Sequence, residues 1–106
     1  MYRGTTPTLR FTLPFPCEEI DVCSIAFSQK LTPYADEPEL IFEKKLSDCS
    51  VSEKTLTLTL SEEDTLKLRS DTEIEIQLRV ACGETRLASP IFKESAERIL
   101  KDGLLI

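Results

Sequence analysis

The sequence predicts an all-β protein: a two-sheet antiparallel immunoglobulin-like sandwich of six to seven strands with one short crossover helix at about residues 61–69. Two runs, at residues 55–60 and 73–80, alternate apolar and polar side chains, as strands do when they bury one face. Helical spacing occurs between these two runs, and turn-forming residues recur at intervals of roughly ten residues elsewhere. This pattern is typical of a sandwich of short strands.

The stretch 55–82 shows the pattern most clearly. In TLTLTL the leucines lie on one face and the threonines on the other, and Ile74, Ile76, Leu78 and Val80 repeat this spacing. Between the two strands, Ser61 stands three residues before Asp64, which is the spacing of a capping box at a helix start. We therefore expect a helical crossover that begins after Ser61 and turns Leu66 inward.

Three further strands are predicted before this stretch, at 9–13, 21–29 and 40–46. After Cys82, the pair Gly83-Glu84 predicts a hairpin whose returning strand contains RLASPIFKES. In this strand Leu87 and Ile91 are expected on one face and Phe92 on the other. Pro90 has no N–H to donate, so the strand is expected to be an edge or to carry a bulge there.

The end of the chain is ambiguous. Residues 96–100 fit helical spacing as well as strand alternation, and both interpretations stay open. We expect the strand to continue to about Leu100, followed by an apolar terminus of Leu104, Leu105 and Ile106.

Strand alternation also predicts which side chains build the core. The expected core consists of Leu9, Phe11, Leu13, Ile25, Phe27, Leu56, Leu58, Leu60, Leu66, Ile74, Ile76, Leu78 and Val80.

Composition limits the classes of function. The 106 residues are expected to form one domain, 1–106, large enough to fold around its own core. A net charge of −6 argues against nucleic-acid and anionic-membrane partners. Histidine is absent, which removes the commonest general base and metal ligand, so we expect no enzyme activity and no cofactor. MYRGTTPTL lacks the apolar segment of a signal peptide, and we expect cytoplasmic synthesis.

The four cysteines, at 17, 23, 49 and 82, form no CxxC pair, so we expect reduced, mostly buried thiols. We further expect the strands 21–29 and 73–82 to run roughly parallel in the sandwich. That arrangement would place Cys23 and Cys82 at opposite ends of the core.

The segment LTPYADEPE is the clearest loop of the chain. Its acidic residues at 33–39 match no EF-hand spacing, and solvated charge is their expected state. A carbohydrate- or calcium-binding sandwich that uses Tyr34, Asp36 and Glu37 remains the alternative function. With two Tyr and no Trp, the chain offers little aromatic surface for a sugar.

Several segments resemble known proteins. RGTTPTLRFTLPF, KKLSDC, LTLTLSEEDTLKL, EIQLRV, LASPI and ERILKDG together resemble small uncharacterised prophage-like proteins of Gram-positive gut bacteria, over most of the chain. The expected strand order is similar to the immunoglobulin-like N-terminal domain of phage upper baseplate proteins. The resemblance implies an assembly or binding role and supplies no catalytic residues.

From these observations we expect a phage-derived structural or interaction module, such as a tail, baseplate or virion-associated adaptor. It would associate with other phage structural proteins or with itself, through a sheet edge and the chain ends. The N-terminal arm is expected to be available for pairing with a neighbour. The residues expected at the interface are Pro90, Leu104, Leu105 and Ile106.

Overall fold

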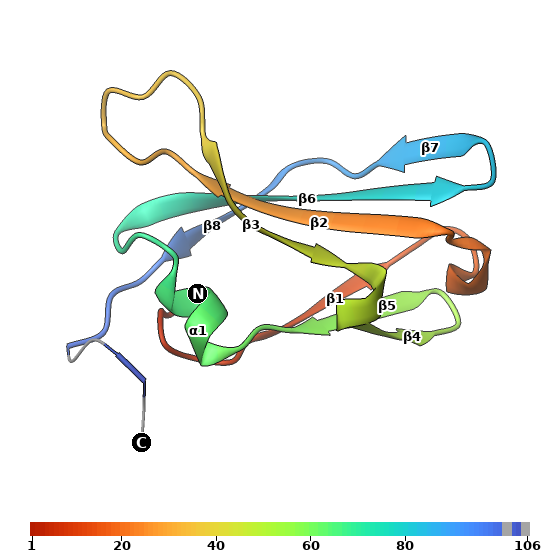
Figure 1. Cartoon of the computed structure of the whole chain (residues 1–106), viewed down its shortest axis with the longest axis horizontal. Helices are drawn as coiled ribbons and strands as arrows, with labels where there is room; N and C mark the ends of the chain where they lie inside the picture. The colour runs from red at the N-terminus through yellow and green to blue at the C-terminus, as the bar shows by residue number, and fades with distance from the viewer. Residues whose placement is uncertain (101–102, 105–106) are drawn as a thin grey trace.

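The computed structural model describes residues 1–100, 103 and 104, and it folds them into two antiparallel sheets stacked as layers (Figure 1). The smaller sheet has the order β1-β5-β4 and consists of β1 (Thr8–Thr12), β5 (Thr55–Thr59) and β4 (Cys49–Ser52). The larger sheet has the order β3-β2-β6-β7, with β8 also paired to β6. Its strands are β2 (Val22–Gln29), β3 (Glu39–Lys45), β6 (Thr72–Cys82), β7 (Thr85–Ala88) and β8 (Phe92–Ala96). The predicted all-β sandwich is confirmed.

The strand order is that of an immunoglobulin-like sandwich. If β1, β5 and β4 are taken as strands B, E and D, and β2, β6 and β7 as C, F and G, both sheets have the neighbours of that fold. Strand β3 then takes the C′ position beside β2. No strand of the described residues takes the place of strand A beside β1, so β1 is an edge strand.

The described residues form eight strands where six to seven are expected, because the returning strand is divided and β4 is additional. Strand β4 is short and forms a hairpin with β5, with Ser52 opposite Thr55. Its two-residue loop contains Glu53 at a φ of 49°, a left-handed conformation usually taken by Gly or Asn. The sequence around Val51 therefore carries neither a long alternation nor a recognisable hairpin turn.

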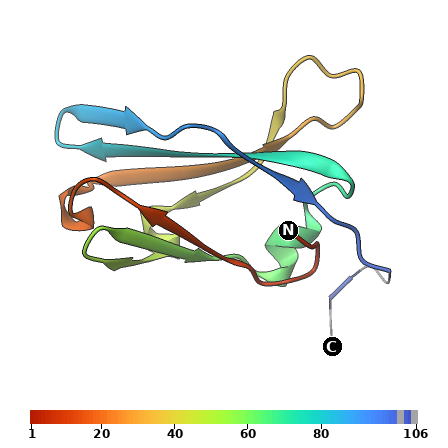
Figure 2. The same ribbon diagram turned by 180° about the vertical axis from the view of Figure 1, so that it is seen from behind.

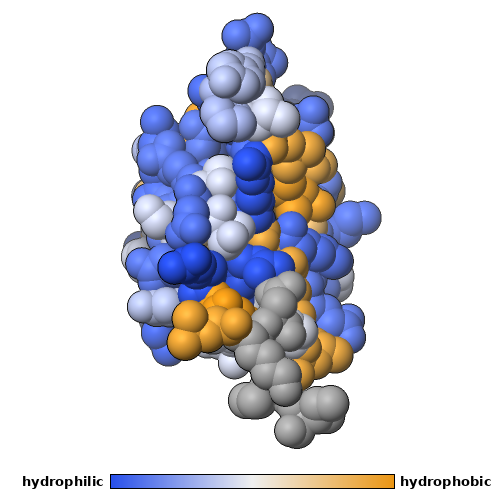
Figure 3. Space-filling view, turned by 90° about the vertical axis from the view of Figure 1, so that its left-hand side faces the viewer, coloured by the Kyte–Doolittle hydropathy of each residue, from blue (hydrophilic) through white to orange (hydrophobic). Residues whose placement is uncertain are grey.

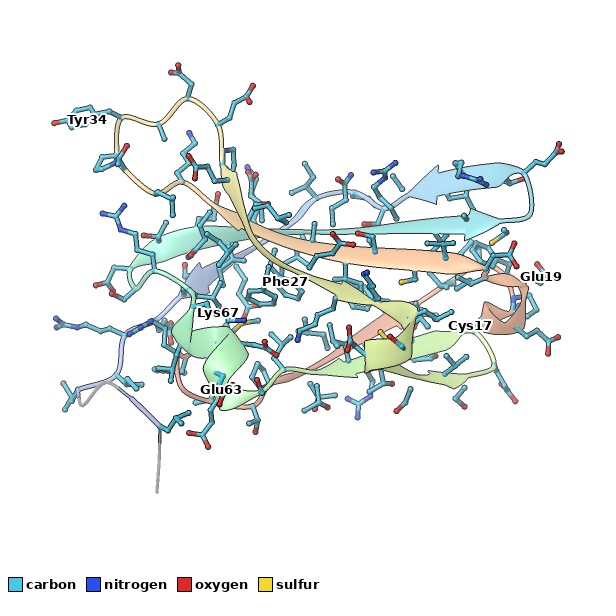
Figure 4. The ribbon with its side chains drawn as sticks, viewed as in Figure 1. Cys17, Glu19, Phe27, Tyr34, Glu63 and Lys67 are labelled. Atoms are coloured by element: carbon cyan, nitrogen blue, oxygen red, sulfur yellow. The ribbon has the colours of Figure 1, made fainter. Side chains whose placement is uncertain are left out.

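Buried side chains of both sheets meet between the layers. Phe27 of β2 lies in this space in Figure 4, and its ring stacks on Phe42 of β3 with centroids 4.5 Å apart. The predicted core is confirmed for the residues of β2, β5 and β6 and for Leu60. The side chains Leu9, Phe11 and Leu13 pack against this core but are only half-buried.

The central pair of the larger sheet is β2 with β6, which are antiparallel and in register from Val22 opposite Ala81 to Gln29 opposite Ile74. The expectation that these two strands run parallel is therefore wrong, because strands C and F are direct neighbours in one sheet of this topology. Cys23 lies opposite Val80, so Cys23 and Cys82 lie at the same end of the pair.

Gln29 ends this alternation as a fully buried polar side chain. Its Oε1 accepts from the Arg69 N–H at 2.7 Å, and its Nε2 donates to the carbonyls of Arg69 and Thr72 at 2.9 and 3.3 Å. One buried amide thus satisfies three backbone groups of the turn that leads into β6. This turn contains Asp71 at a φ of 56°.

The crossover between the sheets is the one-turn helix α1 (Glu62–Leu66). The predicted capping box is confirmed: Ser61 Oγ accepts from the Asp64 N–H, and Asp64 Oδ2 accepts from the Ser61 N–H, both at 3.1 Å. Lys44 of β3 places its Nζ 2.9 Å from Asp64 Oδ2, which ties the helix to the edge of the larger sheet.

The core residue of this segment is Leu68, which is fully buried, and the prediction of Leu66 is wrong. After α1, Lys67 and Leu68 donate to the carbonyls three residues before them, at Asp64 and Thr65. Such a turn has about three residues rather than 3.6, so it rotates Leu68 towards the space between the sheets. Leu66 instead lies beside Gly4 of the N-terminal arm.

Asp64 makes the attachment of α1 sensitive to pH. Burial raises the pKa of Asp64, but the hydrogen bonds from Lys44 and Ser61 and the charge of Lys44 outweigh it and hold the pKa below the ordinary value of 3.8. The ionised carboxylate therefore stabilises the fold at neutral pH. This contribution is lost as the pH falls through the lowered pKa of the folded state.

We expect Lys44→Met to lower the free energy of unfolding by about 1–3 kcal/mol at neutral pH, because a nearly buried carboxylate loses its charged donor. The difference from the wild type is expected to shrink as Asp64 becomes protonated, as measured in urea melts across the acid range. Lys45→Met is the matched control, since Lys45 is exposed on the same strand. A difference that stays constant from neutral pH to well below the pKa of Asp64 would contradict this role.

Candidate functional site

The two long sides of the sandwich differ in how they are closed. On one side the short turn Leu46–Asp48 carries the chain from β3 to β4, and α1 is tied to β3 by the ion pair of Lys44 with Asp64. The other side lies between β1 and the strands β7 and β8, which Figure 2 shows from behind. We refer to Leu9, Phe11, Leu87 and Phe92, which lie along it, as the β1/β8 side.

Burial shows that the β1/β8 side is incompletely covered. Leu9 and Phe11 lie directly opposite Leu58 and Leu56 in the ladder between β1 and β5, so all four side chains face the core. The residues on β5 are fully buried, whereas those on β1 are only half-buried. The difference follows from position, because β5 has a neighbour on both sides and β1 has one.

Across from β1, the edge of the larger sheet carries a β-bulge at Pro90. Ala88 pairs with Arg79 and Phe92 with Ile76, so three residues, 89–91, lie opposite two on β6. Ser89 continues the pairing, since its Oγ accepts from the Leu78 N–H at 3.0 Å and its N–H donates to the Leu78 carbonyl. The prediction that Pro90 marks an edge strand or a bulge is confirmed, and both apply.

The bulge changes which side chains face β1. Leu87 is opposite Val80 and Phe92 is opposite Ile76, so these two share the core-facing side of the sheet. The expectation that Phe92 lies on the other face from Leu87 is wrong, because the extra residue of the bulge inverts the alternation. Leu87 and Phe92 remain 43% and 47% exposed, and the rings of Phe92 and Phe11 have centroids 6.4 Å apart.

The backbone of β1 also has groups along its outer edge that no described strand pairs with. Hydrogen bonds join Pro7 to Leu60 and Leu13 to Lys54 at the two ends of the ladder with β5. Antiparallel pairs alternate between bonded and non-bonded, so the odd-numbered residues of β1 bond to β5. The even-numbered residues direct their N–H and C=O groups away from β5: Thr8, Arg10 and Thr12.

The N-terminal arm is not available for pairing, contrary to expectation. The Arg3 N–H donates to the Glu97 carbonyl, the Glu97 N–H donates to the Met1 carbonyl, and Tyr2 forms a parallel bridge with Glu97. The Arg3 guanidinium donates to the carbonyls of Leu66 and Leu68 at 2.9 and 2.6 Å, at the C-terminal end of α1. The arm is thus bound by its own domain, at the end of β8.

The other residues expected at the interface lie near the end of the chain. Strand β8 ends at Ala96, so the expected continuation of the strand to Leu100 is wrong, and the helical alternative is not seen there either. Leu104 is 52% exposed. Leu105 and Ile106 lie outside the described residues.

The loop at 30–38 projects from the body of the protein. Tyr34 is 93% exposed and points away from the sheets in Figure 4, while Asp36 and Glu37 are exposed beside it. Among the described residues, no three metal-ligating side chains come together. Figure 3 faces the end that carries this loop, and shows apolar residues there in separate areas divided by hydrophilic ones.

A hollow of about 550 Å³ lies under the loop, and Lys30, Arg69, Asp71 and Lys93 are among its lining residues. Its charges are of both signs, and Lys93 lies 3.9 Å from the carboxylates of its neighbours Glu73 and Glu75 on β6. A surface of balanced, solvated ion pairs provides no preference for either an anionic or a cationic ligand.

The four cysteines are free, and for Cys17, Cys23 and Cys49 the environment is unfavourable for nucleophilic chemistry. Burial, with smaller contributions from Cys49 and Cys17, raises the pKa of Cys23 to about 11. Burial also raises the pKa of Cys17 and Cys49. The thiolate is the reactive form of cysteine, so these side chains act as small apolar groups of the core. Figure 4 places Cys17 at the end of the sandwich away from α1.

We expect four thiols to react with a thiol reagent after denaturation without reductant. In the folded protein at mildly alkaline pH, we expect Cys23 to be modified far more slowly than the half-buried Cys49, because it is both buried and held as the thiol. Mass mapping of the modified residues against time measures this order. Two or fewer free thiols in the denatured chain would contradict the prediction of reduced cysteines, and rapid modification of folded Cys23 would contradict its burial.

No helix in the described part of the chain is long and apolar enough to span a membrane. The chain was also compared with models of protein families, with curated proteins and with solved structures, and none of the three comparisons gave a match.

Proposed function

We propose that this protein is a phage-derived structural or interaction module, a tail, baseplate or virion-associated adaptor that works by association with other proteins and not by turnover. The phage context comes from the sequence resemblance described above. The surface for association is the β1/β8 side, together with the apolar residues near the chain end. Its partners are other phage structural proteins or a second copy.

The observation that carries this proposal is the incomplete burial of the β1/β8 side. Leu9 and Phe11 face the core yet stay half-buried, and Leu87 and Phe92 are exposed by more than two fifths across from them. When a partner covers apolar side chains at the rim of a core, their removal from water stabilises the complex. Outside this side, the described surface has a hollow of mixed charge and a loop with one exposed aromatic ring, neither of which favours a particular ligand. Exposed apolar side chains also lie singly on other strands, such as Val22, Leu40 and Val51.

Association is tested by sedimentation velocity of the protein alone, and by co-purification with the structural proteins encoded beside it. We expect a complex with at least one of these, and we expect Leu87→Lys to weaken it by about tenfold or more, because a charge then has to be buried. Val22→Lys is the matched control, since Val22 is also an apolar, exposed residue, 62% against 43% for Leu87, but lies on the outer face of the larger sheet.

A second variant tests the chain end. A truncation after Asp102 removes the apolar terminus and leaves both sheets intact, so loss of the complex by a folded truncated protein would add the terminus to the interface. If the full-length protein is strictly monomeric and binds none of the neighbouring gene products, the association proposal fails.

A further inference from the structure

We propose that the outer edge of β1 receives an extended strand from a partner polypeptide, in the place that strand A occupies in immunoglobulin-like domains. This inference rests on the proposed function, since it names where and how the partner binds. The incoming strand would extend the smaller sheet beyond β1 and cover the β1/β8 side. Such strand addition uses backbone hydrogen bonds for affinity and alternate side chains for specificity.

No strand of the described residues lies at this position, because the chain before β1 goes elsewhere. In the expected topology the segment preceding strand B would pair with it in the same sheet. Here Tyr2 and Arg3 pair with Glu97 at the end of β8, on the opposite sheet. Thr5 adds a second attachment, because its N–H donates to Thr65 Oγ1, and that hydroxyl contacts the Thr5 carbonyl at 2.8 Å. The arm therefore bypasses the outer edge of β1 without covering it.

Of the sheet edges, β1 is the one suited to pairing. Strand β3 is irregular where its register with β2 shifts, and it carries Lys44 and Lys45. The edge of β7 and β8 is interrupted by the bulge at Pro90. Bulges, lysines and prolines are the features that protect edges from added strands. Strand β4 is one residue shorter than β1 and faces away from the exposed residues of the β1/β8 side.

Within its own length, strand β1 has no bulge, lysine or proline, and Arg10 is its one charged residue. Its five residues pair with β5 in one unbroken register from Thr8 opposite Thr59 to Thr12 opposite Thr55. The outward N–H and C=O groups of Thr8, Arg10 and Thr12 form a regular row. Pro7 and Pro14 lie just outside the strand and limit the length of the added segment.

The side chains of the β1/β8 side define what the segment must contain. On its inner face, apolar residues at every second position would cover Leu9 and Phe11 and reach Phe92 across the gap between the sheets, where the rings of Phe11 and Phe92 already meet. On its outer face it would lie beside Arg10, between two threonines, where an acidic residue is complementary. The partner is thus an extended segment that alternates apolar and polar residues, with an acid near its centre.

A second copy of β1 fits this place less well. The antiparallel register that pairs all five residues of two β1 strands places Arg10 directly opposite Arg10 of the other copy. Like charges directly opposite each other in a ladder are destabilising. Any other two-fold register leaves part of the strand unpaired.

The test uses a synthetic peptide, acetyl-Thr-Leu-Thr-Leu-Glu-Leu-Thr-amide, and amide hydrogen exchange of the full-length protein measured by NMR. We expect exchange at Thr8, Arg10 and Thr12 to slow by about tenfold when the peptide is present at roughly ten times its Kd. A peptide with Lys in place of Glu is expected to bind more weakly. The same peptide with alternate amides N-methylated is expected to have no effect, because it cannot complete the ladder.

Two substitutions separate the backbone from the charge. Arg10→Pro removes an outward N–H at a position where an edge strand tolerates proline, and we expect it to abolish the slowing. Arg10→Thr retains the N–H, so we expect it to bind the peptides with Glu and with Lys equally. Thermal melts verify that both variants fold. If Arg10→Pro does not fold, the methylated peptide still tests the backbone hydrogen bonds independently.

Three results would overturn the inference. Slowing confined to β3, β4, β7 or β8 would place strand addition at another edge and leave the association proposal standing. Slowing at β1 that needs no peptide and rises with protein concentration would make a second copy the occupant. If amide exchange at β1 does not slow at about 1 mM peptide, β1 does not bind an added strand with useful affinity. The association proposal itself fails only if no complex forms at all.

Discussion

The antiparallel pairing of β2 with β6 is the constraint on which the rest of the structure depends. It places Ile25 and Phe27 opposite Leu78 and Ile76, so one face of the central ladder is continuously apolar and has to be covered by the smaller sheet. A shift by one residue would turn every one of these side chains to water. Gln29 fixes this register at its end, because its buried amide bonds to the turn that begins β6.

This constraint is met unequally on the two sides of the sandwich. On the side of β3, the chain itself crosses between the sheets, and the ion pair of Lys44 with Asp64 holds α1 in place. On the side of β1, the N-terminal arm crosses only at one end, where Arg3 binds α1 and the end of β8. The remaining length leaves Phe11 and Phe92 partly exposed. The proposed interaction surface is therefore a place where the core is incompletely covered, which is a property of the topology and not of any single residue.

The sequence predicts the parts of this fold that depend on local alternation. The parts that depend on long-range pairing are harder to predict from the sequence. The strand containing Leu56 and Leu58, the Ser61 cap and the break at Pro90 follow from short-range patterns and are confirmed. The inward side chain after α1 is not predicted correctly, since it depends on a change of helical pitch. The exposed edge of β1 depends on where the arm goes, and Arg3 has no local signal for its contacts with the carbonyls of α1.

The central claim is that β1 is an edge strand, with no neighbour on its outer side in the part of the chain that the structure describes. Amide hydrogen exchange of the free protein tests it most directly, residue by residue. The account predicts that along β1 slow exchange alternates with fast, with the Leu9 and Phe11 amides protected by β5 and the Thr8, Arg10 and Thr12 amides open to water. It also predicts protection at residues 55–58 of β5, which lie between two strands. Uniform protection along β1, equal to that of β5, would contradict the account.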